Sequence, residues 1–330
     1  MTFALSILDL ADVGEHETVA DALHASVDLA RHAEALGYSR VWYAEHHNMP
    51  TIASAATSVL IAHVAANTSR IRLGAGGVML PNHSPLTIAE QYGTLASLHP
   101  GRIDLGLGRA PGSDQATFRA LRRDHASADR FPEDVVELQG YLRGRSRIPG
   151  VTATPGHGTN VPLYILGSSL FGAQLAAALG LPYAFASHFA PQALEQAVAL
   201  YRREFRPSED LERPYVIAGV NVIAADDPDT AQTELQATKR RRARLLFGRD
   251  RTLSDDEIDA VLASPGGQQV EQMVRYTAAG TGDEVAAYLE DFARHADADE
   301  LILASAGTSR TARLRSFELV ARAHGLSEAA

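Results

Sequence analysis

The sequence contains no cysteine and no long apolar stretch, and both absences restrict what the protein can do. Without cysteine there is no disulfide, no thiolate nucleophile and no cysteine-ligated zinc or iron–sulfur centre. No run of about 18 uninterrupted apolar residues occurs, so no membrane-spanning helix and no membrane partner are predicted. The N-terminus lacks the basic region and the cleavage site of a signal peptide, and we therefore expect a cytoplasmic protein.

Positive charge is also scarce. The 30 lysines and arginines are outnumbered by 40 aspartates and glutamates, which gives a formal net charge of −10 at pH 7. Proteins that bind DNA or RNA usually present a basic face, so this balance argues against a nucleic-acid partner. The one strongly basic run, residues 239–244, is expected to be the solvated face of a helix.

Short apolar runs alternate with longer amphipathic patterns, which predicts an α/β fold in which each strand is followed by a helix. With 45% hydrophobic and 21% charged residues, the 330-residue chain can build one large core. The predicted strands cover residues 3–8, 40–44, 71–77, 103–108, 163–166, 183–186, 215–224 and 301–304. The predicted helices cover residues 18–36, 53–66, 84–99, 131–142, 169–179, 191–205, 284–294 and 311–323.

Eight such units favour a closed (β/α)8 barrel, the TIM-barrel architecture, as a single domain over residues 1–330. A doubly wound open sheet uses the same units and stays the alternative. Residues 226–282 interrupt the rhythm between the seventh and eighth strands, and we expect them to form an extended, largely irregular insertion with some helical patterns. Segments of this length inside compact domains are usually functional, so we weigh a mobile lid against a peripheral helical insertion.

Two of the predicted helices carry clear boundary signals. Thr18 followed by Asp21 fits a capping box, and Gly37 fits the stop at the other end of the same helix. Ser84-Pro85 places a capping residue before a proline at the first helical position. These signals place helix starts at residues 18 and 84.

Polar residues and glycines gather directly after the predicted strands, where the site of a parallel barrel lies. Glu45-His46-His47 follow the second strand, Gly76-Gly77 end the third, and Arg109 follows the fourth. The fifth strand is followed by Gly167-Ser168-Ser169 and the sixth by Ser187-His188. This placement predicts a ligand site at the carboxyl ends of the strands.

Each of these groups has a physical use in holding a ligand. Gly76 and Gly77 have no Cβ, so a flat ring can lie against their backbone. Arg109 can hold a phosphate through two charged hydrogen bonds, and Ser168 and Ser169 precede a helix whose N–H groups and dipole attract an anion. Taken singly, they fit packing, capping or a surface ion pair; taken together, they predict a ligand with a planar head and a phosphate tail.

A dinucleotide-binding loop is the first alternative. Gly106, Gly108 and Gly112 follow a strand, as the glycines of such a loop do. The full pattern requires glycine at position 111, where this chain has Pro111. No integral NAD site is therefore predicted.

A metal site built on Glu45, His46 and His47 is the second alternative. Adjacent residues of an extended chain point to opposite sides, so the two histidines are badly placed to share one ion. Metal coordination demands a tight geometry. No metal is therefore predicted.

The same residues carry a resemblance to a known family. Residues 45–47, the glycine pair before residues 78–81, and the runs 101–109 and 109–113 resemble the luciferase-like flavin monooxygenases. The similarity covers nearly the whole chain and is closest to the single-gene "group 1" oxidoreductases of that family. It implies a TIM barrel that binds reduced FMN near the ends of strands 3 to 5.

The resemblance also implies an activity and partners. A separate flavin reductase would supply the reduced FMN, and the enzyme would use O2 to oxidise a small organic substrate. It implies a homodimer packed through the helices at residues 53–66 and 84–99. Two alternatives stay open: hydride transfer with the deazaflavin F420, and a flavin-binding protein without turnover.

Individual residues take roles from this resemblance. The family's catalytic histidine, which assists the oxygen chemistry at the flavin, falls on His46. A non-proline cis peptide aligns with Gly76–Gly77. The implied cofactor-binding residues are Gly76, Gly77, Arg109, Gly167, Ser168, Ser169 and Ser187.

The chain departs from the luciferase subunits at four positions near the site. Where the luciferases have a cysteine beside the flavin, this chain has Gly108, and where they have a histidine after strand 3, it has Ser84, with His83 next to it. Where they have an acidic residue before the phosphate serine, it has Gly167, and where they have a threonine in the following helix, it has Phe171. These departures put light emission and aldehyde specificity in doubt and leave flavin binding intact.

Overall fold

The strands close into a barrel. The computed structural model describes residues 3–14, 16–109, 115–123, 125–248, 251 and 253–326. The barrel strands, all parallel, are β1 (Ala4–Asp9), β2 (Arg40–Tyr43), β3 (Arg72–Met79), β4 (Ile103–Gly108), β5 (Leu163–Gly167), β6 (Tyr183–Phe185), β7 (Val216–Ala224) and β9 (Glu300–Ser305). Because β9 pairs with both β1 and β7, and β7 also pairs with β6, the ring is complete. The predicted TIM barrel is confirmed, and the open-sheet alternative is wrong.

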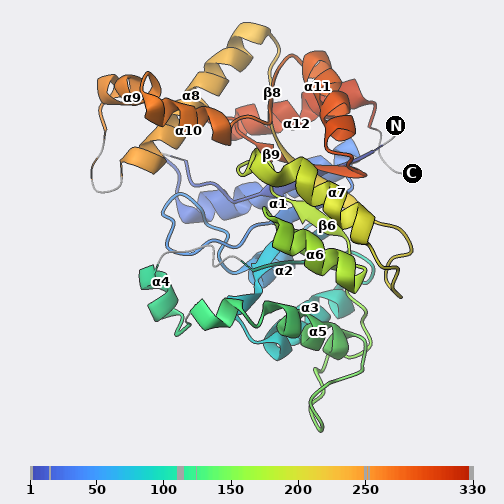
Figure 1. Cartoon of the computed structure of the whole chain (residues 1–330). Coiled ribbons are helices and arrows are strands. Elements are labelled where there is room, and N and C mark those ends of the chain that lie inside the picture. Colours follow the sequence, from blue (N-terminus) through green and yellow to red (C-terminus); the bar gives the residue numbers. More distant parts are fainter. Residues whose placement is uncertain are drawn as a thin grey trace.

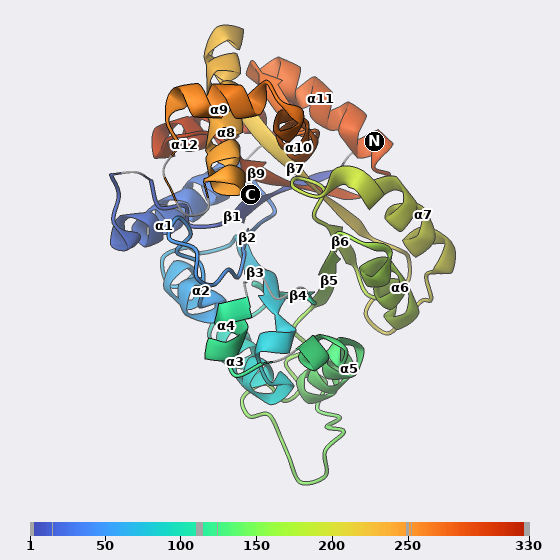
Figure 2. The ribbon, with the colours of Figure 1, turned by 60° about the vertical axis from the view of Figure 1, so that its left-hand side comes forward.

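Helices surround this barrel, as Figures 1 and 2 show. The ones that follow barrel strands are α1 (Val19–Leu36), α2 (Thr57–Ala65), α3 (Pro85–Leu98), α5 (Phe131–Leu142), α6 (Leu170–Leu179), α7 (Leu194–Glu204) and α12 (Arg310–His324), and α11 (Gly282–His295) precedes β9. A short helix, α4 (Gln115–Ala120), lies between β4 and α5 and was not predicted. Within the described residues, none of the helices combines the length and apolarity needed to span a membrane.

The predicted helix starts are confirmed where a capping side chain is present. The Thr18 hydroxyl accepts from the Asp21 N–H, the Asp21 carboxylate accepts from the Thr18 N–H, and Gly37 ends the helix with φ at 85°. Ser84 caps α3 in the same way through the Thr87 N–H. The helix expected from residue 53 begins only at Thr57, because residues 52 and 53 are bonded to the loop after β1.

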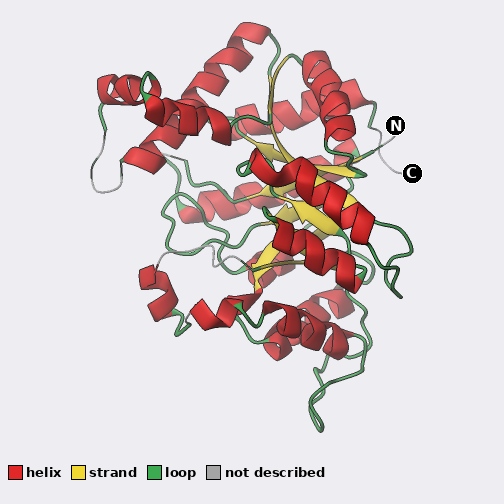
Figure 3. Cartoon of the chain, viewed as in Figure 1, coloured by secondary structure: helices red, strands yellow, loops and turns green. Residues whose placement is uncertain are grey.

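The segment of residues 226–282, between β7 and α11, is mostly helical, so the expectation of a largely irregular insertion is wrong. It contains α8 (Pro228–Phe247), α9 (Asp255–Leu262) and α10 (Pro265–Met273), which lie together at one side of the barrel (Figure 3). It ends in a ninth parallel strand, β8 (Thr277–Gly280), which was not predicted. This strand pairs with the last four residues of β7, which extend beyond the short strand β6.

Two apolar clusters form the core of the barrel and its surrounding helices, and two small ones lie at the end of β7 and among α8, α9 and α10. The larger apolar cluster fills the space between the barrel and the helices, and a smaller one inside the barrel includes Leu8, Trp42, Ile217 and Ile302. Along β2, β5, β6, β7 and β9 residues of the two sets alternate, as the side chains of a β-strand do. This alternation determines which strand-end residues face the interior of the barrel.

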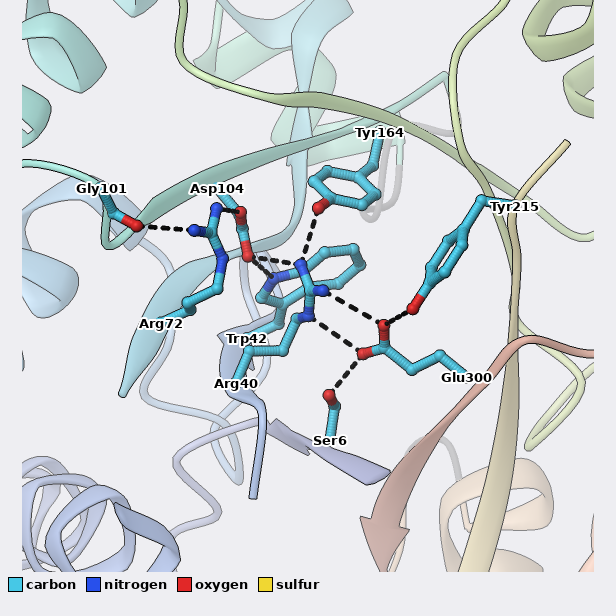
Figure 4. Close-up of polar contacts among 9 residues, drawn as sticks. All are labelled: Ser6, Arg40, Trp42, Arg72, Gly101, Asp104, Tyr164, Tyr215 and Glu300. Atoms are coloured by element: carbon cyan, nitrogen blue, oxygen red, sulfur yellow. Dashed lines mark hydrogen bonds and ion pairs between the residues drawn. The ribbon is translucent and has the colours of Figure 1, made fainter. Parts of the chain in front are cut away.

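The N-terminal end of the barrel is closed by buried polar side chains (Figure 4). Arg40 lies between two carboxylates, with Nη1 2.7 Å from Asp104 Oδ2 and Nε 3.0 Å from Glu300 Oε1. Both carboxylate side chains are fully buried, and Arg72 forms a second ion pair with Asp104. We call this set the floor network; its members are Ser6, Arg40, Trp42, Arg72, Asp104, Tyr164, Tyr215 and Glu300.

Candidate active site at the barrel mouth

The end of β2 distributes its side chains between two faces. Trp42 and Ala44 belong to the apolar cluster inside the barrel, whereas Tyr43 packs in the outer core. Glu45, His46 and His47 follow the last residue of the strand, Tyr43. Glu45 Oε1 and His47 Nε2 are joined by a hydrogen bond of 2.9 Å, whereas the charge of His46 acts on His188 inside the mouth. The two histidines therefore have different surroundings, which is consistent with their predicted divergence.

Glu45 is the centre of a hydrogen-bonded cluster that the sequence reasoning missed. Its side chain accepts from His47 Nε2 and His83 Nε2, both at 2.9 Å, from the Met79 N–H at 3.0 Å and from the Asn82 amide at 3.4 Å. Burial alone would raise the pKa of Glu45, but the hydrogen bonds from His47 and His83 outweigh it and lower this pKa to about 2. An ionised carboxylate therefore ties the loop after β2 to the loop after β3.

His188 lies inside the mouth, next to the middle of β7. Its imidazole rests on Gly219, where a Cβ would lie 2.3 Å from Nδ1 and would displace the ring. Burial lowers the pKa of His188 to about 3, and the nearby charges of Arg242 and His46 act in the same direction. His188 is therefore a neutral imidazole at physiological pH.

The glycine pair of β3 has the cis peptide that the resemblance implied, between Gly76 and Gly77. A Cβ on Gly76 would lie 2.9 Å from atoms of Leu8 and Trp42, and one on Gly77 would lie 2.8 Å from the Gly106 carbonyl oxygen. Packing inside the barrel is thus sufficient to require both glycines. Their role as a platform for a flat ring stays a prediction.

Arg109 lies beside the start of α6, although the two are far apart in the sequence. Its guanidinium carbon is 4.1 Å from the ring centroid of Phe171, in the first turn of α6, so the side chain is held over that ring. Ser168 and Ser169 are exposed there, and the N-cap Ser169 makes no side-chain capping hydrogen bond. An exposed cation therefore adjoins a helix N-terminus without a side-chain cap, which is an anion-binding arrangement.

The other two predicted cofactor residues are placed differently. Gly167 ends β5, and its carbonyl oxygen accepts from the Ala186 N–H at 2.9 Å. Ser187 is buried, and its hydroxyl donates to the Gly219 carbonyl oxygen at 2.6 Å. The Ser187 hydroxyl proton is therefore already bonded within the barrel wall. Residues 110–113, which belong to the motif after β4 and include Pro111, lie outside the described residues.

The basic run in α8 is not a solvated face, and that expectation is wrong. Lys239 pairs with Glu271 of α10, and Arg240 and Arg244 pair with Asp255 near the start of α9. Arg242 turns the other way, toward the barrel, and donates from Nη2 to Asn221 Oδ1 of β7 at 3.3 Å. The run therefore joins α8 to α9 and α10 and brings one guanidinium to the mouth.

The chain belongs to the luciferase-like monooxygenase family, whose sequence model matches residues 1–299. It is 50% identical over 322 residues to a luciferase-like monooxygenase of Escherichia coli K12, with 96% of both chains covered. It is 35% identical to the N-acetyl-S-alkylcysteine monooxygenase of Bacillus subtilis 168, with 86% of both chains covered. The crystal structure of apo-MsnO8 superimposes with a TM-score of 0.88 at 38% identity, over 99% of both chains.

More distant structures share the fold. The oxygenating constituent of 3,6-diketocamphane monooxygenase from Pseudomonas putida, in complex with FMN, has a TM-score of 0.74 at 14% identity over 97% of both chains. An F420-dependent secondary alcohol dehydrogenase has a TM-score of 0.73 at 15% identity, over 98% of this chain and 99% of that one. The fold therefore occurs with either cofactor.

Proposed function

We propose that the protein is an FMN-dependent monooxygenase that takes reduced FMN from a separate flavin reductase and uses O2 to oxidise a small organic substrate. The pairing of Arg109 with the N-terminus of α6 carries this proposal. A phosphate there would accept charged hydrogen bonds from the guanidinium and further ones from the backbone N–H groups after Ser168 and Ser169. FMN presents such a phosphate together with a planar ring.

In this proposal, bound FMN supplies the electrons and the site for oxygen, and the chain supplies position and proton control. Arg109 and the start of α6, with Gly167 before it, hold the phosphate. The Gly76–Gly77 segment borders the ring, and the buried Ser187 keeps the opposite wall in place. His46, on the inner face of the mouth, holds or transfers a proton at its imidazole, a group that exchanges protons near neutral pH.

Glu45 serves this site indirectly. Its hydrogen bonds to His47 and to the Met79 N–H tie the segment after β2 to the end of the neighbouring strand β3, next to His46 and Gly77. A catalytic side chain has to be held in place by such supporting contacts. Glu45 is therefore a positioning residue in this account.

Two other functions are kept as candidates. F420 also carries a phosphate, and the F420-dependent neighbour shares the fold, so hydride transfer with F420 is the second candidate. The third is a flavin-binding protein without turnover. Thioethers of the N-acetyl-S-alkylcysteine type are the first substrates to test, because one relative is named for them.

A titration with four ligands separates these candidates. The purified protein is titrated with reduced FMN, oxidised FMN, riboflavin and reduced F420, followed by single turnovers with and without O2. We expect FMN to bind more tightly than riboflavin and oxidation of substrate to require O2. Tight binding of F420 with turnover in the absence of O2 would replace the proposal with the second candidate. FMN binding with no oxidation of any thioether tried would favour the third.

We also propose a homodimer packed through α2 and α3, in the cytoplasm. Val59 of α2 and Leu98 of α3 are 69% and 66% exposed, and burial of such side chains at an interface is favourable. Ala65 of α2 is buried in the larger core cluster and does not belong to this face. Light scattering that shows a monomer at micromolar concentration would contradict the dimer.

A further inference from the structure

Arg242 is a cation at the barrel mouth that the proposed phosphate site does not use. It is half-buried on α8, and its Nη2 lies 3.3 Å from Asn221 Oδ1. Burial lowers the pKa of Arg242, as does the neighbouring charge of Arg241, and only Asp12 acts in the opposite direction. Removing a guanidinium from water is unfavourable unless an anion or several hydrogen bonds replace the water.

The protein itself provides little of that replacement. Across the described part of the chain, Arg242 forms no ion pair, and the Asn221 contact is its one hydrogen bond to protein. Asp12, the nearest compensating carboxylate, is already paired with Arg313 at 3.0 Å. Most of the five N–H donors of this guanidinium are therefore left for another group.

The position of Arg242 is nevertheless well defined. The Asn221 amide nitrogen donates to the His188 carbonyl oxygen at 2.6 Å and lies 3.4 Å from the Tyr276 carbonyl oxygen. These two carbonyl groups fix the orientation of the amide, so Oδ1 faces Arg242. The guanidinium is thus held at Asn221 in the middle of β7, beside the neutral imidazole of His188.

This position is separate from the proposed phosphate site. Arg109 follows β4, whereas Asn221 belongs to β7, three strands further around the eight-stranded ring. A phosphate bound at Arg109 and the start of α6 would lie two to three strands away from Arg242. The guanidinium of Arg242 would then stay available to the second molecule in the site, which is the substrate.

We infer that Arg242, held by Asn221, recognises a carboxylate on the substrate, so that the enzyme takes small apolar carboxylic acids. This inference deepens the proposed function and rests on it. A carboxylate matches the planar donor fork of a guanidinium, and one arginine balances its single charge. Phe189, which is 47% exposed and packs edge-to-face on His188 at 5.0 Å, offers an apolar surface nearby for the rest of the molecule.

The test uses benzoate as the probe and benzamide as its uncharged match. Dissociation constants are measured by ligand-observed NMR on the FMN-loaded protein and, separately, on the flavin-free protein. We expect saturable benzoate binding, weakened about tenfold or more in Arg242→Gln and less in Arg242→Lys, as loss of a charged hydrogen bond predicts. Benzamide should bind more weakly than benzoate to the wild type.

Arg244→Gln is the matched control, because it removes the same charge from the same helix at an exposed ion pair with Asp255. It should leave benzoate affinity unchanged. The inference is overturned if Arg242→Gln binds benzoate as tightly as the wild type, if both variants lose it equally, or if the wild type does not bind benzoate saturably. Failure of the wild type to bind FMN would instead overturn the proposed function, and the flavin-free titration separates the two results.

Discussion

The two ends of the barrel use charged side chains in opposite ways. At the N-terminal end, Arg40 and Arg72 face Asp104 and Glu300, and every one of these charges is paired inside the protein. At the C-terminal mouth, Arg109 and Arg242 form no ion pair within the described residues. The floor network therefore satisfies itself, whereas the mouth presents cationic groups to something outside the chain.

This difference indicates that the charged residues of the floor network stabilise the fold, whereas those of the mouth bind a ligand. Charges that are buried and mutually paired cannot bind a ligand without being broken apart, so substitutions there should affect folding. Charged side chains at an opening that have no ion-pair partner in the protein lower the stability of the folded state. They are expected where a bound ligand supplies the opposite charge. The Glu45 cluster is the exception at the mouth, because its carboxylate is fully engaged with His47, His83 and backbone.

The largest effect is expected from Arg40→Met, which leaves the buried Glu300 carboxylate without its cationic partner and Asp104 with Arg72 alone. Breaking a buried ion pair in this way should lower the free energy of unfolding by about 3–5 kcal/mol, measured by urea denaturation. Arg244→Gln, at an exposed pair, should lower it by about 0–1 kcal/mol. If both variants lose the same free energy of unfolding, the floor network is no more important for stability than an exposed ion pair.

Glu45→Gln should change how stability depends on pH. The folded pKa of Glu45, about 2, lies below its ordinary value of 4.5. Its stabilisation is therefore complete above about pH 4.5 and is lost as the pH falls toward 2, and it amounts to something on the order of 3 kcal/mol. Denaturation midpoints of the wild type should fall more steeply across this range than those of Glu45→Gln. Parallel slopes would show that this carboxylate is not held as described.

His46→Ala should keep FMN affinity and reduce oxygenation about 10²-fold, as loss of a positioned acid–base group does. His47→Ala should reduce it less, because His47 faces Glu45 on the outer side of the strand. Turnover of an N-acetyl-S-alkylcysteine with supplied reduced FMN measures both. An equal loss in the two variants, or no loss in His46→Ala, would mean that the inner and outer faces do not differ as argued.

Arg109→Ala should weaken FMN binding about tenfold to hundredfold, the scale of a lost charged hydrogen bond. Riboflavin has no phosphate and should bind the wild type and the variant about equally. Fluorescence titration of both flavins measures the difference. If the variant binds FMN as tightly as the wild type, the phosphate is held elsewhere.

The smallest effect is expected in the rate of trypsin cleavage within the insertion, residues 226–282. We expect trypsin to cut the free protein first between α8 and α9, near Arg249 or Arg251, and bound FMN with substrate to slow that cut. Arg251 is exposed, and Arg249 lies outside the described residues. Ligands should slow the cut because a lid that closes over bound FMN and substrate is less accessible to trypsin. If the segment resists trypsin as well as the barrel helices do and ligands change nothing, the insertion is a fixed appendage.

The fold could be predicted because its signals are local. Helix periodicity and the caps at Thr18 and Ser84 depend on residues a few positions apart, and their predicted positions are confirmed. Strand β8 was missed because Thr277–Gly280 is short and contains little apolar surface. Its pairing depends on the end of β7, more than 50 residues earlier, which no local pattern shows.

The site could be predicted only in part. Arg109 and the residues before α6 could be predicted as candidates because each follows a strand end, and strand ends meet at one face of a barrel. The Glu45 cluster has a partial signal in the sequence, since residues two apart on a strand share a face, but His83 comes from another loop. The orientation of Arg242 toward the barrel could not be predicted, because the acidic partners of its neighbours lie on α9 and α10, whose positions no local pattern shows.

A crystal structure of the protein with bound FMN tests the central claim most directly. The account predicts the flavin at the C-terminal mouth, with its phosphate within hydrogen-bond distance of the Arg109 guanidinium and the first backbone N–H groups of α6, and with Arg242 clear of it. Electron density that places the phosphate at Arg242, or the flavin away from the mouth, would contradict the account.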